Sequence, residues 1–250
     1  MMLQIKDLHK SFGGFVAIRN VHFELEAGVT HAIIGPNGAG KTTFFNLITG
    51  HLEPTEGSVA FEGGVITGKQ PHQIVKLGLA RSFQRINIYP RMTVFENVQV
   101  ALIARDSNHF RLFTLGAGLN RDETAELLDL VGLHDEADGI AGELAYGKQK
   151  QLELAIALAA NPKLLLLDEP TAGMSPQETV EAIALIKQII DARGLTLLFT
   201  EHDMGVVFDI ADSISVLHHG EIIASGEPDQ VRNDAEVKRV YLGATESDAA

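Results

Sequence analysis

Apolar and polar residues alternate along the N-terminal part of the chain, as in Leu3 and Ile5 and again over 21–25. A period of two is typical of strands with one buried face, and the intervening pair Gly13-Gly14 favours a turn. A similar stretch at 58–61 is followed by another glycine-rich turn. The pattern therefore predicts an antiparallel sheet in this region.

The pattern changes further along, where short and nearly continuous apolar runs replace the alternation. Three such runs occupy 29–34, 164–167 and 195–200. Strands of a parallel sheet that is covered on both faces have this appearance. We therefore expect an α/β core built on a parallel sheet.

Helical signals dominate the middle of the chain. Thr93 and Glu96 have the spacing of a capping box at the start of an apolar-rich run to Ala104. Asn120 begins a second helix in the same way, and Gly132 marks its end. The sequence therefore predicts helices after positions 93 and 120.

These signals suggest one domain over 1–250 with a subdomain. We expect the catalytic core and the antiparallel layer to comprise 1–85 and 161–250, and an inserted helical subdomain to comprise 86–160. The loop at 107–120 is unusually apolar. It could fold back on the subdomain or contact a partner, and the sequence leaves both readings open.

Composition narrows the class of protein and its surroundings. The chain has 250 residues, no cysteine and a formal net charge of -13. Disulfides and thiolate metal sites are excluded, which agrees with a reducing compartment such as the cytoplasm. The acidic charge disfavours a nucleic-acid partner. No apolar stretch reaches the roughly 18 to 20 residues that span a bilayer, so we expect membrane contact only through a partner.

The strongest chemical signal is a phosphate-loop pattern, in which two glycines separated by four residues precede Lys and Thr. It comprises Gly35, Pro36, Asn37, Gly38, Ala39, Gly40, Lys41 and Thr42, with Thr43 next to it. Backbone N–H groups of such a loop surround phosphate oxygens, assisted by the N-terminus of the following helix. We expect Lys41 to pair with the β and γ phosphates and Thr42 to bind Mg²⁺. A glycine-rich turn without a ligand is the structural alternative.

Two acids end the second apolar run. We expect Asp168 to hold Mg²⁺ through its water shell and Glu169 to orient and deprotonate the attacking water. The two carboxylates could instead cap the next turn. Their occurrence in a chain that also carries the phosphate loop favours the catalytic interpretation.

A histidine follows the third apolar run. In open α/β sheets, ligands bind beyond the carboxyl ends of the strands. His202 is therefore expected to contact the γ-phosphate or the attacking water. An isolated histidine is more often structural, so this role depends on the three strand ends coming together.

With these elements, nearly the whole chain resembles the ATP-binding subunits of ATP-binding-cassette (ABC) transporters, which have a RecA-like P-loop NTPase core. The most diagnostic element is the signature segment around Ala145, Tyr146 and Gly147. The resemblance implies that this segment docks on the γ-phosphate of ATP held by an opposing subunit, helped by a following helix over 151–160. The family commonly has Ser and Gly where Ala145 and Tyr146 stand, so a hydroxyl is missing here.

The resemblance implies three further residue roles. Gln84 occupies the glutamine-loop position, which meets Mg²⁺ or the attacking water and joins the core to the helical subdomain. Phe12 is placed to stack on adenine, with core packing as its competitor. Ser175 ends the loop that crosses the dimer interface, although a capping box with Glu178 is a sufficient local explanation.

The signature variant and the phrases at 81–84, 92–97 and 168–174 resemble the branched-chain and hydrophobic amino-acid uptake branch. This implies ATP and Mg²⁺ as cofactors and a position on the cytoplasmic face of the inner membrane. The implied partners are a second ATP-binding subunit, identical or a paralogue, transmembrane permease subunits and an extracytoplasmic substrate-binding protein. Two ATP-binding subunits are needed because one chain's phosphate loop and signature cannot reach each other's nucleotide.

Other functions fit parts of the same pattern. The cargo could be urea or an amide, another small organic solute, or exported lipopolysaccharide or lipid. A non-transport ABC ATPase of DNA repair or translation usually has long coiled-coil insertions or two cassettes. A phosphate-loop kinase would need an acceptor-binding lid and would not explain the signature segment.

Overall fold

The protein, described here from a computed structural model, contains two β-sheets. The structure describes residues 1–82, 87–106 and 119–240. The smaller sheet is antiparallel and has the order β2-β1-β4-β5. Its strands are β1 (Leu3–Phe12), β2 (Phe15–Leu25), β4 (Glu56–Phe61) and β5 (Gly64–Val65). The predicted antiparallel layer is confirmed.

The larger sheet has the order β10-β9-β3-β8-β7-β6. All neighbouring pairs are parallel except β9 and β10, which form an antiparallel edge. Its strands are β3 (Thr30–Ile34), β6 (Leu79–Arg81), β7 (Leu164–Asp168), β8 (Thr196–Thr200), β9 (Ser213–His218) and β10 (Glu221–Gly226). The three predicted apolar runs become β3, β7 and β8, adjacent in the centre of this sheet.

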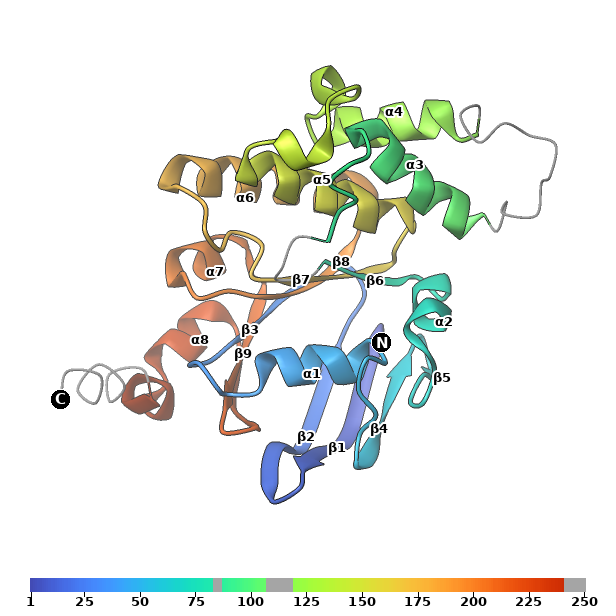
Figure 1. Cartoon of the computed structure of the whole chain (residues 1–250). Coiled ribbons are helices and arrows are strands. Elements are labelled where there is room, and N and C mark those ends of the chain that lie inside the picture. Colours follow the sequence, from blue (N-terminus) through green and yellow to red (C-terminus); the bar gives the residue numbers. More distant parts are fainter. Residues whose placement is uncertain (83–86, 107–118, 241–250) are drawn as a thin grey trace.

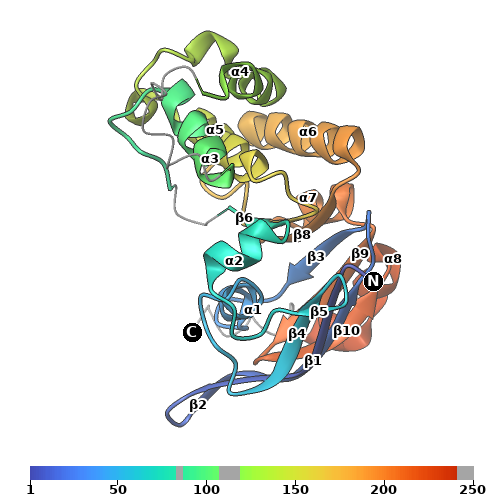
Figure 2. The same cartoon turned by 90° about the vertical axis from the view of Figure 1, so that its right-hand side faces the viewer.

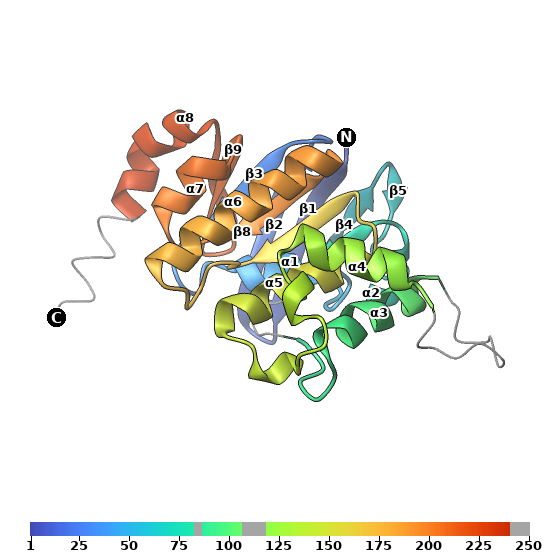
Figure 3. The ribbon, with the colours of Figure 1, turned by 90° about the horizontal axis from the view of Figure 1, so that it is seen from above.

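Helices cover the larger sheet on both faces (Figures 1 and 2). They are α1 (Lys41–Ile48), α2 (Pro71–Lys76), α3 (Val94–Arg105), α4 (Arg121–Leu130), α5 (Tyr146–Ala159), α6 (Pro176–Arg193), α7 (Met204–Ile210) and α8 (Pro228–Asn233). Helices α3, α4 and α5 contact one another and group on one side of α6 (Figure 3). Within the described residues, none of the helices combines the length and apolar character needed to cross a bilayer.

Alternate residues of β7 belong to two different hydrophobic cores. Leu164 and Leu166 pack in the cluster that α1 shares with the antiparallel sheet. Leu165 and Leu167 face the opposite side and pack with residues of α3 to α7. Since side chains alternate along a strand, an apolar residue is needed at each position, which explains the unbroken run of leucines.

The helix starts show where local sequence signals hold and where they do not. Thr93 and Glu96 form the predicted capping box at α3, and Glu96 N donates to Thr93 Oγ1 at 3.1 Å. Helix α4 begins directly after Asn120, as predicted, but the Asn120 side chain makes no capping hydrogen bond. The Asn120 backbone is left-handed, with φ of 53°, and its amide instead donates to Asp106 Oδ2 at 2.7 Å.

A buried histidine on β3 ties that strand to β9. His31 Nδ1 lies 2.6 Å from Ser213 Oγ, and Nε2 lies 2.9 Å from Ser215 Oγ. The ring also meets the Phe23 ring edge-on, with 4.9 Å between centroids. Burial lowers the pKa of His31 to about 4, so the imidazole is neutral in the folded protein.

We predict that His31 makes the fold less stable in acid. Unfolded His31 gains its proton near its ordinary pKa of 6.5, whereas native His31 stays neutral down to about 4. The unfolded state therefore binds more protons across this window, and stability falls as pH drops, by roughly 2 to 3 kcal/mol. Urea unfolding at pH 7.5 and 4.5 should show a smaller pH effect in His31→Gln than in wild type. Equal pH effects would contradict the assignment.

Candidate active site

The carboxyl ends of three parallel strands form the floor of the site. In the register of β3 and β8, Ile33 pairs with Thr200, and Thr200 in turn pairs with Asp168 of β7. The phosphate loop follows β3, Asp168 ends β7 with Glu169 directly after it, and His202 follows β8. Strand pairing thus brings together segments that are far apart in the sequence.

A surface hollow of about 330 Å³ surrounds the phosphate loop. Its lining residues are Phe15, Ala17, Asn37, Gly38, Ala39, Gly40, Lys41, Thr42, Thr43 and Glu169. Most of the predicted phosphate-loop residues therefore line the same hollow as Glu169. Helix α1 begins at Lys41, so its N-terminus faces this hollow.

Two glycines allow the loop to pass between β2 and β9. Gly40 has φ of 109°, and a Cβ there would lie 2.7 Å from the carbonyl oxygen of Ala17. A Cβ on Gly35 would lie 2.1 Å from the carbonyl oxygen of Leu217. Any side chain at these positions would displace backbone, so both glycines are required by close packing.

The ammonium group of Lys41 is folded against its own loop. Nζ donates to the carbonyl oxygens of Gly35 at 2.6 Å and Pro36 at 3.3 Å. Burial lowers the pKa of Lys41, and the negative charges of Glu169 and Asp168 oppose this shift. The lysine is therefore a buried cation close to both predicted acids.

Glu169 has a backbone conformation that is uncommon for a residue with a side chain. Its φ is 52°, and its N–H donates to both the carbonyl oxygen and Oγ1 of Thr200, each at 3.1 Å. A left-handed conformation costs about 1 to 2 kcal/mol and persists only where surrounding contacts enforce it. The carboxylate Oε1 lies 2.6 Å from His202 Nε2, so the two predicted catalytic side chains are in contact.

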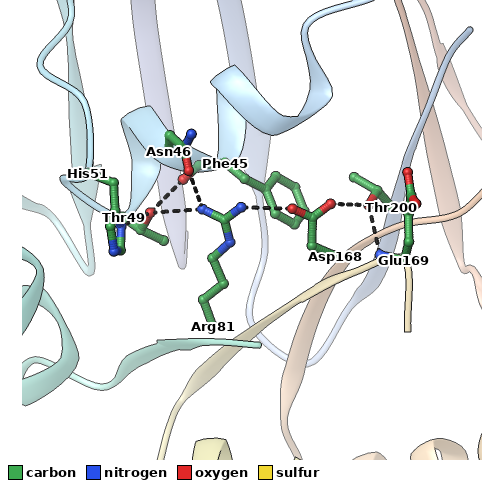
Figure 4. Close-up of polar contacts among 8 residues, drawn as sticks. All are labelled: Phe45, Asn46, Thr49, His51, Arg81, Asp168, Glu169 and Thr200. Atoms are coloured by element: carbon green, nitrogen blue, oxygen red, sulfur yellow. Dashed lines mark hydrogen bonds and ion pairs between the residues drawn. The ribbon is translucent and has the colours of Figure 1, made fainter. Parts of the chain in front are cut away.

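Both oxygens of Asp168 accept hydrogen bonds from the protein (Figure 4). Thr200 Oγ1 donates to Oδ1 at 2.8 Å, and Arg81 Nη2 donates to Oδ2 at 2.7 Å. The Arg81 partner was not anticipated, because no local pattern relates an arginine at the end of β6 to an acid at the end of β7. Nothing in the spacing of the sequence could have indicated this contact.

Comparison with known proteins identifies the family of this site. A family model described as "ABC transporter" matches residues 18–172, which is more than half of the chain. The chain belongs to the ABC transporter family. A second model, described as "Branched-chain amino acid ATP-binding cassette transporter", matches residues 221–247.

Individual ABC proteins resemble the chain over nearly its full length. The high-affinity branched-chain amino acid transport ATP-binding protein LivG of Escherichia coli K12 is 39% identical over 255 residues, covering 97% of this chain and 98% of LivG. The ADP conformation of an ATP-binding cassette gives a TM-score of 0.86 at 33% identity, covering 97% and 98% of the two chains. A dimeric post-hydrolysis cassette bound to ADP and Pi gives 0.78 at 27% identity, covering 91% and 99%. The predicted P-loop fold is confirmed, and the chain is an ABC ATPase that binds ATP.

Glu201 is a further residue of this ABC ATPase that the sequence did not single out. It is buried, and its Oε1 accepts from the backbone N–H of Thr171 at 2.9 Å and from the Thr171 hydroxyl at 2.5 Å. Its Oε2 accepts from the N–H of His202 at 3.0 Å. Glu201 thereby fixes the loop after Glu169 to the segment that carries His202.

Two aromatic rings lie at the tip of the β1-β2 hairpin. Phe12 pairs with Phe15 in the strand register. The core-packing alternative for Phe12 is wrong, because this residue is 46% exposed and its ring centroid lies 5.0 Å from Lys10 Nζ. Phe15, for which the sequence predicted no role, is the ring that lines the hollow.

The signature residues lie at the start of α5 and do not line the hollow of their own chain. The helix begins at Tyr146, so the expected start at position 151 is wrong. Tyr146 Oη donates to the carbonyl oxygen of Ala172 at 3.1 Å, and its ring would lie 3.3 Å from a Cβ on Gly173. Ala145 precedes the helix as its N-cap, and Gly147 lies in its first turn.

Ser175 forms the capping box at the start of α6. Its N–H donates to Glu178 Oε2 at 2.8 Å, and Glu178 N donates back to Ser175 Oγ at 3.3 Å. This local role is confirmed, while the contact across a dimer interface stays a prediction. The predicted Gln84 lies outside the described residues, as does most of the loop at 107–120.

Proposed function

We propose that this ABC ATPase powers the uptake of branched-chain or other hydrophobic amino acids through a separate permease. The observation that carries the hydrolytic role is the contact between Glu169 and His202 at the phosphate-loop hollow, 2.6 Å between Oε1 and Nε2. The choice of cargo rests on the match of residues 221–247 and on the printed function of LivG.

The proposed reaction is in-line attack of water on the γ-phosphorus of ATP. The loop N–H groups and Lys41 hold the β and γ phosphates, for which Lys41 exchanges its carbonyl contacts for phosphate oxygens. Glu169 accepts a proton from the water as the bond to the bridging oxygen breaks, which leaves ADP and phosphate. His202 holds the Glu169 carboxylate and contacts the γ-phosphate or the water, and Gln84 is proposed to meet the same water.

We propose a Mg²⁺ position beside the Thr42 hydroxyl and Asp168, with Asp168 holding the ion through its water shell. Mg²⁺ prefers hard oxygen ligands and keeps several waters, which suits one hydroxyl on the hollow and one buried carboxylate. Gln84 is proposed as a further ligand. When bound, the ion neutralises charge on the β and γ phosphates.

The proposed active form contains two ATP-binding subunits arranged head to tail. Ala145, Tyr146 and Gly147 are absent from the lining of their own chain's hollow, which fits a role at the ATP of the opposing subunit. Ala145 has no hydroxyl to offer the γ-phosphate. The contact would therefore come from backbone N–H groups at the start of α5 and from its helix dipole. The second subunit is an identical chain or a paralogue.

The permease is proposed to contact the helical subdomain at 86–160 from the cytoplasmic face of the inner membrane. A surface hollow of about 440 Å³ between α2, α3 and α5 offers a place for it. Val75, which is 39% exposed, and Ala101 contribute apolar surface there, and Lys76 and Arg105 contribute charge. An extracytoplasmic substrate-binding protein completes the proposed transporter.

We predict that Glu169→Gln separates binding from hydrolysis. The amide cannot accept the proton, so the hydrolysis rate in the assembled transporter should fall by about 10² to 10⁴, with ATP still bound. Lys41→Ala is the contrasting variant, because losing its charge should weaken ATP binding itself. Steady-state phosphate release and equilibrium ATP binding measure the two effects, and wild-type turnover in Glu169→Gln would exclude Glu169 as the base.

A second prediction separates the two rings at the hairpin tip. If Phe12 stacks on adenine, Phe12→Ala should weaken ATP binding by about fivefold or more, since a stacked base contributes about 1 to 3 kcal/mol. Inorganic tripolyphosphate, which has no base, should bind Phe12→Ala as it binds wild type. Phe15→Ala is the matched control and should have the smaller effect on ATP, and the reverse order would transfer the role to Phe15.

The proposed cargo is tested with the assembled transporter. Membrane proteins that co-purify with the tagged chain are identified and reconstituted with it and with their substrate-binding protein. Leucine, isoleucine or valine should then stimulate ATP hydrolysis, whereas urea should not. Stimulation by an unrelated solute alone would refute the amino-acid cargo without affecting the ATPase assignment.

A further inference from the structure

The strongest feature that the proposed chemistry leaves unused is the buried ion pair between Arg81 and Asp168. Arg81 Nη2 lies 2.7 Å from Asp168 Oδ2, and the two side chains are 5% and 3% exposed. Burial makes an ionised group costly unless an opposite charge and hydrogen bonds replace its lost hydration. Arg81 thus gives Asp168 a permanent positive neighbour, because a guanidinium does not lose its proton in proteins.

Helix α1 holds the guanidinium group in this position. Arg81 Nη1 donates to Asn46 Oδ1 at 2.6 Å and more weakly to Thr49 Oγ1 at 3.4 Å. The ring of Phe45 lies 5.5 Å from the guanidinium carbon (Figure 4). Since the guanidinium is a rigid plane, these contacts fix the direction in which Nη2 faces Asp168. Arg81 can leave the acid only by also breaking its contacts with the helix that follows the phosphate loop.

The second oxygen of Asp168 is engaged by Thr200, whose hydroxyl donates to Oδ1 at 2.8 Å. Each carboxylate oxygen can accept more than one hydrogen bond, so Asp168 can still bind a water molecule of a metal ion. It does so with part of its negative charge already balanced by Arg81. A divalent cation placed at the same carboxylate is repelled by the guanidinium, and this repulsion is strong where water is excluded.

We propose that Arg81 is a positioning residue that holds Asp168 in place and weakens the affinity of the adjacent Mg²⁺ position. This inference rests on the proposed binding of Mg²⁺ beside Asp168. The guanidinium offsets the charge that Asp168 would otherwise present to Mg²⁺, which favours release of the ion together with ADP. A pair that merely joins β6 to β7 would affect stability and leave the Mg²⁺ dependence of nucleotide binding unchanged.

The test compares Arg81→Gln with Arg81→Lys, which keeps the charge. Binding of a fluorescent ADP analogue is measured first in EDTA and then during a Mg²⁺ titration. Arg81→Gln should lower the midpoint Mg²⁺ concentration by about tenfold, because a repelling unit charge is removed from a buried position. Its affinity for the analogue in EDTA should stay at the wild-type value, and Arg81→Lys should keep a midpoint near that of wild type.

The outcomes separate this inference from the proposed nucleotide site. An unchanged or higher midpoint in folded Arg81→Gln overturns the role of Arg81, whereas the binding in EDTA reports on the phosphate loop alone. Failure of wild type to bind the analogue in EDTA would instead refute the proposed nucleotide site. Thermal unfolding of each variant verifies that the midpoints compare folded proteins.

A measurement on wild type covers the case in which Arg81→Gln does not fold. The ¹⁵N side-chain signal of Arg81 is assigned by its disappearance in Arg81→Lys. With ADP at saturation, added Mg²⁺ should shift this signal because the ion shares Asp168 with the guanidinium. Arg105, which pairs with Glu123 on the helical side, is the internal control and should not shift. An Arg81 signal that is identical with and without Mg²⁺ overturns the proposal.

Discussion

Parallel hydrogen bonding of β8 between β3 and β7 is the constraint on which the rest of the site depends. The pairing of Thr200 with Ile33 on one side and with Asp168 on the other sets three strand ends at the same level. The phosphate loop, the two acids and His202 can meet only because of this register. Hydrophobic cores on both faces of the sheet hold the register in place, since a slip by one residue would exchange the two faces.

Thr200 connects the two acids within this frame. Its side chain is fully buried and donates to Asp168, and it also accepts from the N–H of Glu169. These contacts offset the strained, left-handed backbone of Glu169, whose carboxylate contacts His202. Glu201 fixes the next loop through Thr171. The positions of the proposed metal acid and the proposed base are therefore determined together.

The signature segment and the loop after Glu169 form one packed unit. Tyr146 contacts Ala172 and Gly173, and Glu178 of the α6 capping box lies beside Gly147, 3.0 Å from where a Cβ would stand. Because α5 begins at Tyr146, its first backbone N–H groups belong to the signature residues themselves. The helix dipole therefore acts at the segment that is proposed to contact the ATP of the opposing subunit.

The sequence alone determined the elements whose causes are local. The leucine run of β7, the glycines of the phosphate loop and the capping boxes at Thr93 and Ser175 depend on residues that are neighbours in the chain. Their predicted structure is therefore found in the fold. The side-chain cap at Asn120 is absent because the left-handed backbone of this residue departs from the extended conformation that capping requires.

Only the tertiary structure decided which distant side chains meet. The contacts of Asp168 with Arg81, of Thr171 with Glu201 and of Glu169 with His202 each join residues at or just after the ends of different strands. Phe15 likewise lines the hollow because the hairpin tip lies beside the phosphate loop in the folded chain. These pairings follow from strand order and register, which are set by burial of both sheet faces and leave no spacing signal along the chain.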